Sequence, residues 1–100
     1  LQIDGTTVEV MNSAPVDDKF RAFGWNTLVI NGHDFEDIDR AVSAFHTERK
    51  RPTAVIMNTV KGKGVSFMEG KCSWHGKAPA KEEFDAACAE ISARLGKEGE

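Results

Sequence analysis

Two short apolar runs on either side of a helix-like segment constrain the fold of this chain more than any other feature. WNTLVIN (25–31) and TAVIMNT (53–59) are rich in β-branched residues and lie next to Gly or Pro, which is typical of buried strands. Apolar residues recur at helical spacing across 35–48: Phe35, Ile38, Val42 and Phe45. This order predicts a βαβ unit with parallel strands and a right-handed crossover.

Two strands are too few for a stable parallel sheet, because both of its edges would lie open. We therefore expect further strands to come from elsewhere and predict an α/β fold with an incomplete sheet. The chain has 100 residues and begins with Leu1 rather than Met, so we expect it to begin inside a larger domain.

Further elements flank the βαβ unit. Residues 1–14 are predicted to form a loop or a short extended piece. Pro15 is expected in the first turn of a helix that Gly24 ends. Asp34 is a candidate N-cap for the 35–48 helix, with Asp37 at the capping-box spacing.

The last helix is predicted to start near Lys81 and to stop at Gly96. Four residues form its apolar face: Phe84, Cys88, Ile91 and Leu95. The tail, residues 97–100, is expected to be frayed.

Composition excludes some classes of function. The net charge of −3 does not favour a nucleic-acid binder, and no apolar run is long enough to cross a bilayer. Cys72 and Cys88 form no CxxC pair, which favours a reducing compartment over a disulfide scaffold. We expect a cytoplasmic protein with no membrane or nucleic-acid partner.

The segment 59–79, TVKGKGVSFMEGKCSWHGKAP, concentrates positive charge and glycine. Gly62 and Gly64 permit unusual backbone angles, and the neighbouring Lys61 carries a charge suited to phosphate. The glycine spacing does not match a nucleotide P-loop. A solvated surface loop is the alternative, but loops of about twenty residues are often functional.

Histidines are the other candidates. His75 follows Trp74, which we expect to pack and to hold the imidazole where it donates to an anionic oxygen or transfers a proton. A structural loop histidine is the alternative. His33 lies directly before the candidate N-cap, and a loop histidine in that place is more often structural or solvated than functional. His46 is predicted to be solvated. The sequence contains no Cys/His cluster with metal-ligand spacing, so it does not predict a transition-metal site.

Five segments taken together resemble transketolase. They are FRAFGW (20–25), INGHD (30–34), PTAVIMNTVKGKG (52–64), WHGKAP (74–79) and EEF (82–84). The match is nearest to the thiamine-diphosphate-binding domain, or to the N-terminal subunit of transketolases split into two chains, and runs nearly end to end.

This resemblance implies that residues 1–96 are the C-terminal part of a thiamine-diphosphate-binding α/β domain, followed by the tail 97–100. The family's GDG motif and the asparagine that completes it are absent here. We expect both in a missing N-terminal part of the same domain.

The resemblance also implies roles for four residues. Leu1 falls where the family gives a backbone carbonyl to Mg²⁺, and Ile3 where an apolar residue lies near the thiamine rings. Lys61 falls where a lysine lies against the cofactor. His75 falls where a histidine contacts the diphosphate and the substrate's hydroxyls, and it is the expected catalytic residue.

The implied activity is transfer of a two-carbon ketol unit between sugar phosphates in the pentose phosphate pathway. The implied partner is a pyrimidine-binding domain or subunit, in a homo- or hetero-oligomer such as a dimer, which supplies an activating glutamate. The fragment alone is expected to be inactive. Alternatives are a 1-deoxyxylulose-phosphate synthase-like enzyme, which the segment following KGKG disfavours, and a non-catalytic truncated module.

Overall fold

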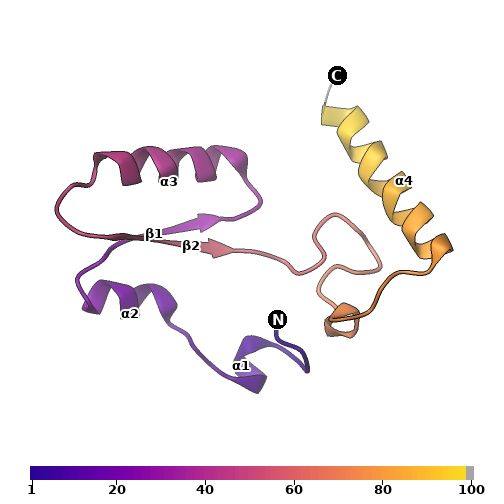
Figure 1. The fold of residues 1–100 in the computed structure, drawn as a ribbon, viewed down its shortest axis with the longest axis horizontal. Helices are drawn as coiled ribbons and strands as arrows, with labels where there is room; N and C mark the ends of the chain where they lie inside the picture. The colour runs from indigo at the N-terminus through magenta and orange to yellow at the C-terminus, as the bar shows by residue number, and fades with distance from the viewer. Residues whose placement is uncertain (99–100) are drawn as a thin grey trace. The chain divides into compact units, whose positions relative to one another are not determined.

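The computed structural model describes residues 1–98. These residues form two compact units (Figure 1). We call Met11–Thr59 the strand unit, and Leu1–Val10 together with the described residues from Val60 onward the loop unit. Each unit is described by itself below.

The strand unit is built on two parallel strands, β1 (Asn26–Asn31) and β2 (Thr53–Asn58). Their register runs from Asn26 opposite Thr53 to Asn31 opposite Asn58. Helices α3 (Phe35–Thr47) and α2 (Val16–Ala22) lie on opposite sides of the strands (Figure 1). The predicted parallel βαβ unit is confirmed, and the sheet of the described residues is open at both edges.

Helix α2 ends in a Schellman motif, as Gly24 predicted. Gly24 has φ 84°, and its N–H donates to the Arg21 carbonyl at 2.9 Å. The Trp25 N–H donates to the Phe20 carbonyl at 3.1 Å, and the two rings meet edge to face at 5.1 Å. These contacts satisfy the last carbonyls of α2 and place Trp25 directly before β1. Pro15 is the N-cap, one residue earlier than predicted.

Asp34 caps α3, since its carboxylate accepts the Glu36 N–H at 2.9 Å. The capping-box role predicted for Asp37 is wrong, because the Asp34 N–H instead donates to the Asn31 carbonyl. The Asp37 carboxylate accepts the Asn31 N–H at 2.9 Å. Asp37 therefore ties the start of α3 to the end of β1.

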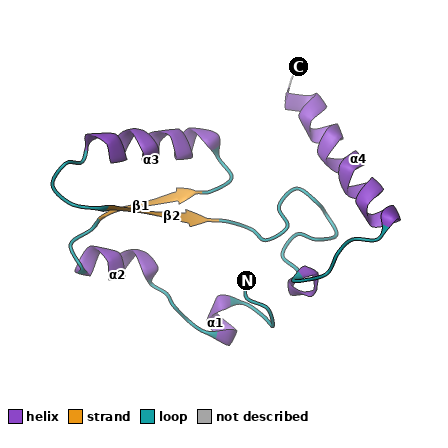
Figure 2. Ribbon diagram, in the orientation of Figure 1, coloured by secondary structure: helices purple, strands orange, loops and turns teal. Residues whose placement is uncertain are grey.

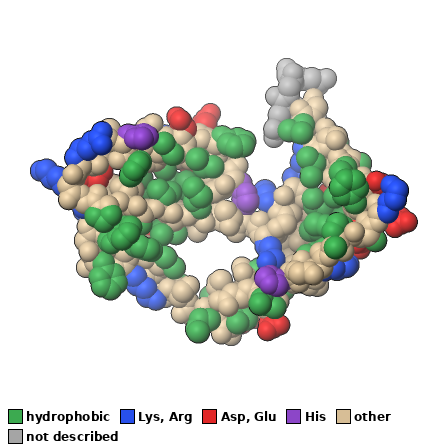
Figure 3. Space-filling model, viewed as in Figure 1, with side chains coloured by type: hydrophobic (Ala, Val, Ile, Leu, Met, Phe, Trp, Pro, Cys, Tyr) green, Lys and Arg blue, Asp and Glu red, His purple; other side chains and the backbone are tan. Residues whose placement is uncertain are grey.

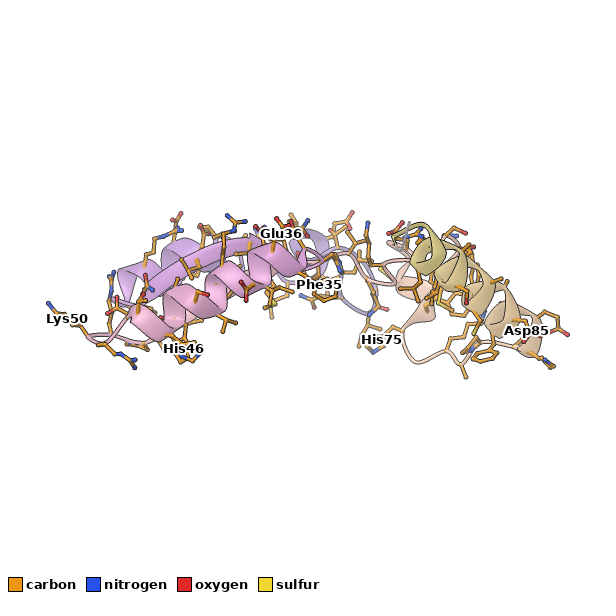
Figure 4. All side chains as sticks on the ribbon, turned by 90° about the horizontal axis from the view of Figure 1, so that it is seen from above. Phe35, Glu36, His46, Lys50, His75 and Asp85 are labelled. Atoms are coloured by element: carbon orange, nitrogen blue, oxygen red, sulfur yellow. The ribbon has the colours of Figure 1, made fainter. Side chains whose placement is uncertain are left out.

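The buried residues of the strand unit are small. Ala41 and Ala54 are 4% and 7% exposed, whereas Phe35 is 87% exposed (labelled in Figure 4). Val42 and Phe45 are also about half exposed, at 48% and 51%. The apolar spacing predicted the helix correctly, but most of its apolar side is exposed in the described residues. Two strands are too narrow to cover the whole apolar side of α3, and Ala41 makes the close approach.

The loop unit begins with a short helix, α1 (Thr7–Val10), where we predicted loop or extended chain. A complete capping box holds it. The Thr6 N–H and hydroxyl donate to the Glu9 carboxylate at 3.0 and 2.7 Å, and the Glu9 N–H donates back to the Thr6 hydroxyl at 3.2 Å. The T-x-x-E spacing of residues 6–9 is the signal that we missed.

Helix α4 spans Lys81–Glu98 and starts where predicted. It does not stop at Gly96, which has no positive φ and continues the helix. Two residues of the predicted frayed tail, 97–98, are therefore helical, and 99–100 lie outside the described residues.

The predicted apolar face of α4 is exposed, and hydrophobic side chains are visible over this helix in Figure 3. Phe84, Ile91 and Leu95 are 56%, 45% and 65% exposed, and Cys88 is an exposed free thiol. Across residues 1–98, no helix is both long and apolar enough to span a membrane.

Candidate functional site

The segment between β2 and α4 is almost entirely irregular (Figure 2), apart from the short 3₁₀ helix η1 (Cys72–Trp74). The Gly70 N–H donates to the Lys61 carbonyl at 2.8 Å and closes residues 61–70 into a ring. Gly62 has φ 73°, and a Cβ there would lie 2.7 Å from the Met68 carbonyl oxygen. Only glycine fits this position without moving the backbone, so the ring fixes the main chain at Lys61.

Contacts within the 61–70 ring of main chain also stabilise it. Val65 is 7% exposed, and its carbonyl accepts the N–H groups of Met68 and Glu69, each at 3.0 Å. Lys63 Nζ lies 3.3 Å from the Glu69 carboxylate, and this ammonium lowers the pKa of Glu69. The charge of Lys63 is thus balanced within the ring.

Trp74 packs as predicted. It is half-buried, its Nε1 donates to the Phe67 carbonyl at 3.0 Å, and the two rings lie 5.6 Å apart. Lys77 Nζ lies 4.0 Å from the centre of the Trp74 ring and 3.2 Å from Glu83. Lys77 therefore fastens the segment to the start of α4, where Glu83 also accepts the Ala80 N–H.

Ser66 connects the ring to the middle of α4. Its N–H and its hydroxyl both donate to the Glu90 carboxylate, at 2.7 and 2.6 Å. The hydroxyl contact first, and then the amide contact, hold the pKa of Glu90 below its usual value. We call this pair of hydrogen bonds the Ser66–Glu90 clip.

Lys61 and His75 come together at the surface of the same unit. Lys61 Nζ lies 3.4 Å from His75 Nδ1; Lys61 is half-buried, and His75, labelled in Figure 4, is exposed. When the ammonium donates to Nδ1, the ring hydrogen lies on Nε2. The pair then offers neighbouring N–H donors, which suit an anion with several oxygens, such as a diphosphate.

The remaining candidates lie apart from this pair in the sequence. Leu1 and Ile3, 42% and 60% exposed, belong to the loop unit and precede α1. His33 belongs to the strand unit, where its N–H donates to Asn31 Oδ1 at 3.0 Å. His46 is exposed on α3, as predicted. Within residues 1–98, no group of three or more His, Cys, Asp or Glu could hold a metal ion.

Sequence reasoning singled out Lys61, His75 and Trp74 but missed the clip. Ser66 and Glu90 are 24 positions apart, and nothing in their local sequence marks them as partners. Lys63 and Lys77 belong to the 59–79 segment, whose positive charge suggests a phosphate site, yet both have carboxylate partners.

Comparison with known proteins gives a consistent result. The family described as "Transketolase, thiamine diphosphate binding domain" matches residues 1–98. An apulose-4-phosphate transketolase subunit of Phocaeicola vulgatus is 44% identical over 97 residues, which are 97% of this chain and 34% of that protein.

The 6-deoxy-6-sulfo-D-fructose transketolase subunit SqwG of a Clostridium species is 42% identical over 91 residues, which are 91% of this chain and 33% of that protein. The mouse protein "Transketolase" is 36% identical over 74 residues, 74% of this chain and 11% of the mouse protein. The chain spans about a third of the length of the two subunit relatives. It belongs to the transketolase family, and its residues 1–98 match the thiamine diphosphate binding domain.

Proposed function

We propose that this chain is part of a cytoplasmic transketolase that transfers a two-carbon ketol unit from a ketose phosphate to an aldose phosphate. The match to the thiamine diphosphate binding domain over residues 1–98 supports the cofactor. Two relatives of this chain are named as transketolase subunits, which supports a partner subunit. That partner brings the pyrimidine-binding domain and the activating glutamate in a homo- or hetero-oligomer.

The 3.4 Å approach of Lys61 Nζ to His75 Nδ1 is the observation that carries this proposal. A diphosphate brings several anionic oxygens, and these two side chains converge on a loop in which two further lysines, Lys63 and Lys77, already have carboxylate partners. Lys61 is the charge that binds the diphosphate. His75 donates to a diphosphate oxygen through its second ring nitrogen.

Leu1 and Ile3 complete the chain's share of the site. The Leu1 carbonyl is a hard oxygen ligand suited to Mg²⁺, and the exposed Ile3 side chain offers an apolar surface to the thiamine rings. One carbonyl is far short of the six or so oxygens that a divalent cation needs, and the described residues form no acidic cluster. The other ligands come from outside this chain.

The bound cofactor supplies an electron sink for cleavage of the bond beside the substrate's carbonyl. The chain's own residues bind and orient. His75, which is exposed, reaches the sugar hydroxyls, where its imidazole takes a proton from a hydroxyl and gives it back in the reverse step. The glycines of the ring let the backbone lie close to the ligand.

An assay of the full-length protein with its partner subunit tests this proposal. A ketose phosphate and an aldose phosphate are mixed with thiamine diphosphate and Mg²⁺, and the sugar products are identified by mass spectrometry. We expect products that differ from the substrates by two carbons, and none when the cofactor is omitted. Absence of any cofactor-dependent product would contradict the proposal. So would formation of 1-deoxyxylulose phosphate in a parallel reaction in which pyruvate, whose decarboxylation supplies a two-carbon unit without the C1 hydroxyl, replaces the ketose phosphate.

A further inference from the structure

We propose that the Ser66–Glu90 clip is a positioning contact that holds the Lys61–His75 pair ready for the anionic ligand. The inference rests on the proposed function for its ligand. Its structural part, that the clip sets the surroundings of His75, can be tested without any ligand. Neither Ser66 nor Glu90 contacts Lys61 or His75 through a hydrogen bond described above, so they act through the ring.

The first step runs from the clip to Lys61. Ser66 follows the buried Val65, whose carbonyl holds the turn that leads to Gly70. The Gly70 N–H is bonded to the Lys61 carbonyl at 2.8 Å. A shift of Ser66 therefore moves the turn that fixes the backbone of Lys61.

The second step runs from the clip to His75. Phe67 follows Ser66 directly, and its carbonyl accepts the Trp74 Nε1 hydrogen at 3.0 Å while the two rings pack. His75 is the residue after Trp74 and caps η1. The clip is thus connected to both members of the pair, to each through a separate set of contacts.

The chemistry of the clip gives it a defined geometry. One carboxylate accepts two hydrogen bonds from one residue, a charge-assisted arrangement that is stronger than two neutral bonds. Glutamine has one carbonyl oxygen and an NH₂ group, so Glu90→Gln cannot accept both donors in the same way. Ser66→Ala removes the hydroxyl donor and keeps the amide.

The test uses the full-length protein carrying Glu90→Gln, Ser66→Ala or both. Asp85→Asn is the matched control, since Asp85 is an exposed carboxylate on the same helix that pairs with Lys81 four residues away. Two quantities are measured: the NMR signals of the His75 imidazole without cofactor, and the Kd for thiamine diphosphate with Mg²⁺.

We expect both clip variants to shift the His75 signals and to weaken cofactor binding by about three- to tenfold, as loss of a hydrogen bond to a positioning contact would. The double variant should bind no more weakly than the worse single one, because both changes break one contact. Asp85→Asn should change neither quantity. The non-additive loss shows that both changes act through the same contact. Shifted His75 signals without cofactor, compared with the Asp85→Asn control, show that this contact positions the imidazole.

Unchanged His75 signals in both clip variants would overturn the inference, as would losses of affinity that add in the double variant. Equal shifts in Asp85→Asn would also overturn it. If the wild-type protein binds no thiamine diphosphate, the proposed function fails, and the His75 signals alone decide whether the clip positions this residue.

Discussion

The two units of this chain are each stabilised by a different kind of contact. In the strand unit, regular elements pair and cap one another, through the β1–β2 ladder, the Schellman motif at Gly24 and the Asp34 cap. In the loop unit, side chains hold an irregular backbone, through the Ser66–Glu90 clip and the Trp74–Phe67 contact.

This difference separates scaffold from site. The strand unit leaves Phe35 87% exposed and both sheet edges open, so its regular elements need further chain to cover them. The polar contacts of the loop unit fix Lys61 and His75, where ligand chemistry is expected. Substitutions in the strand unit should therefore alter stability, whereas substitutions at the pair should alter binding and turnover.

The largest effect is expected from isolating the chain. We predict that the 100-residue chain has no transketolase activity even with saturating cofactor and Mg²⁺, because the proposed function takes the second wall of the site and most metal ligands from outside this chain. Calorimetry should show no thiamine diphosphate binding tighter than about 1 mM. Micromolar binding by the purified chain would mean that the loop unit makes a site unaided.

The next largest effect is expected on turnover when the imidazole of His75 is removed. His75→Ala in the full-length protein should lower kcat by roughly 10²–10⁴-fold, the range expected for a group that transfers a proton. His75 is exposed, so the melting temperature should change little. His46→Ala, an exposed histidine on α3, is the control. Wild-type kinetics with a lowered melting temperature would make His75 structural instead.

Removing the ammonium of Lys61 should have a smaller effect, and only on the affinity for the cofactor. Lys61→Ala should weaken thiamine diphosphate binding by roughly ten- to a hundredfold, through loss of a charge-assisted contact. Lys71→Ala, an exposed lysine of the same segment, is the matched control and should bind normally. Titration of the cofactor checks both variants, and equal affinities would place Lys61 outside the site.

The smallest effect belongs to the strand unit. Gly24→Ala should destabilise the end of α2 by about 1–2 kcal/mol, since φ 84° disfavours any residue with a Cβ. Amide exchange in α2 and β1 measures this loss. Gly96→Ala, at a helical glycine with open space around it, should be neutral or stabilising. Weaker cofactor binding in Gly24→Ala would contradict the contrast between the units.

The elements of the strand unit could be predicted because their signals are local. The periodicity of 35–48, the Gly24 cap and the Asp34 cap all act within a few residues, and each appears in the structure. These signals did not predict which residue packs: Ala41 rather than Val42 or Phe45 lies against the strands. Periodicity identifies an apolar side of a helix but not which part of it a narrow sheet can cover.

The candidate site could be predicted from the sequence only in part, because only some of its signals are local. Lys61 and His75 were recognisable by the motifs around them, and the structure places their nitrogens 3.4 Å apart. The Glu90 contact joins residues 24 positions apart, and Lys63 is balanced by a loop carboxylate. Such pairings depend on how an irregular backbone folds back, which no local pattern records.

The most direct test of the central claim, that the Lys61–His75 pair binds the diphosphate, is an NMR titration of the full-length protein. The His75 imidazole signals are followed while thiamine diphosphate and Mg²⁺ are added, and thiamine without phosphate serves as the matched ligand. We predict that the diphosphate form shifts the His75 signals with the same Kd as calorimetry reports, and that thiamine leaves them in place. Unchanged His75 signals at saturating thiamine diphosphate would contradict the account.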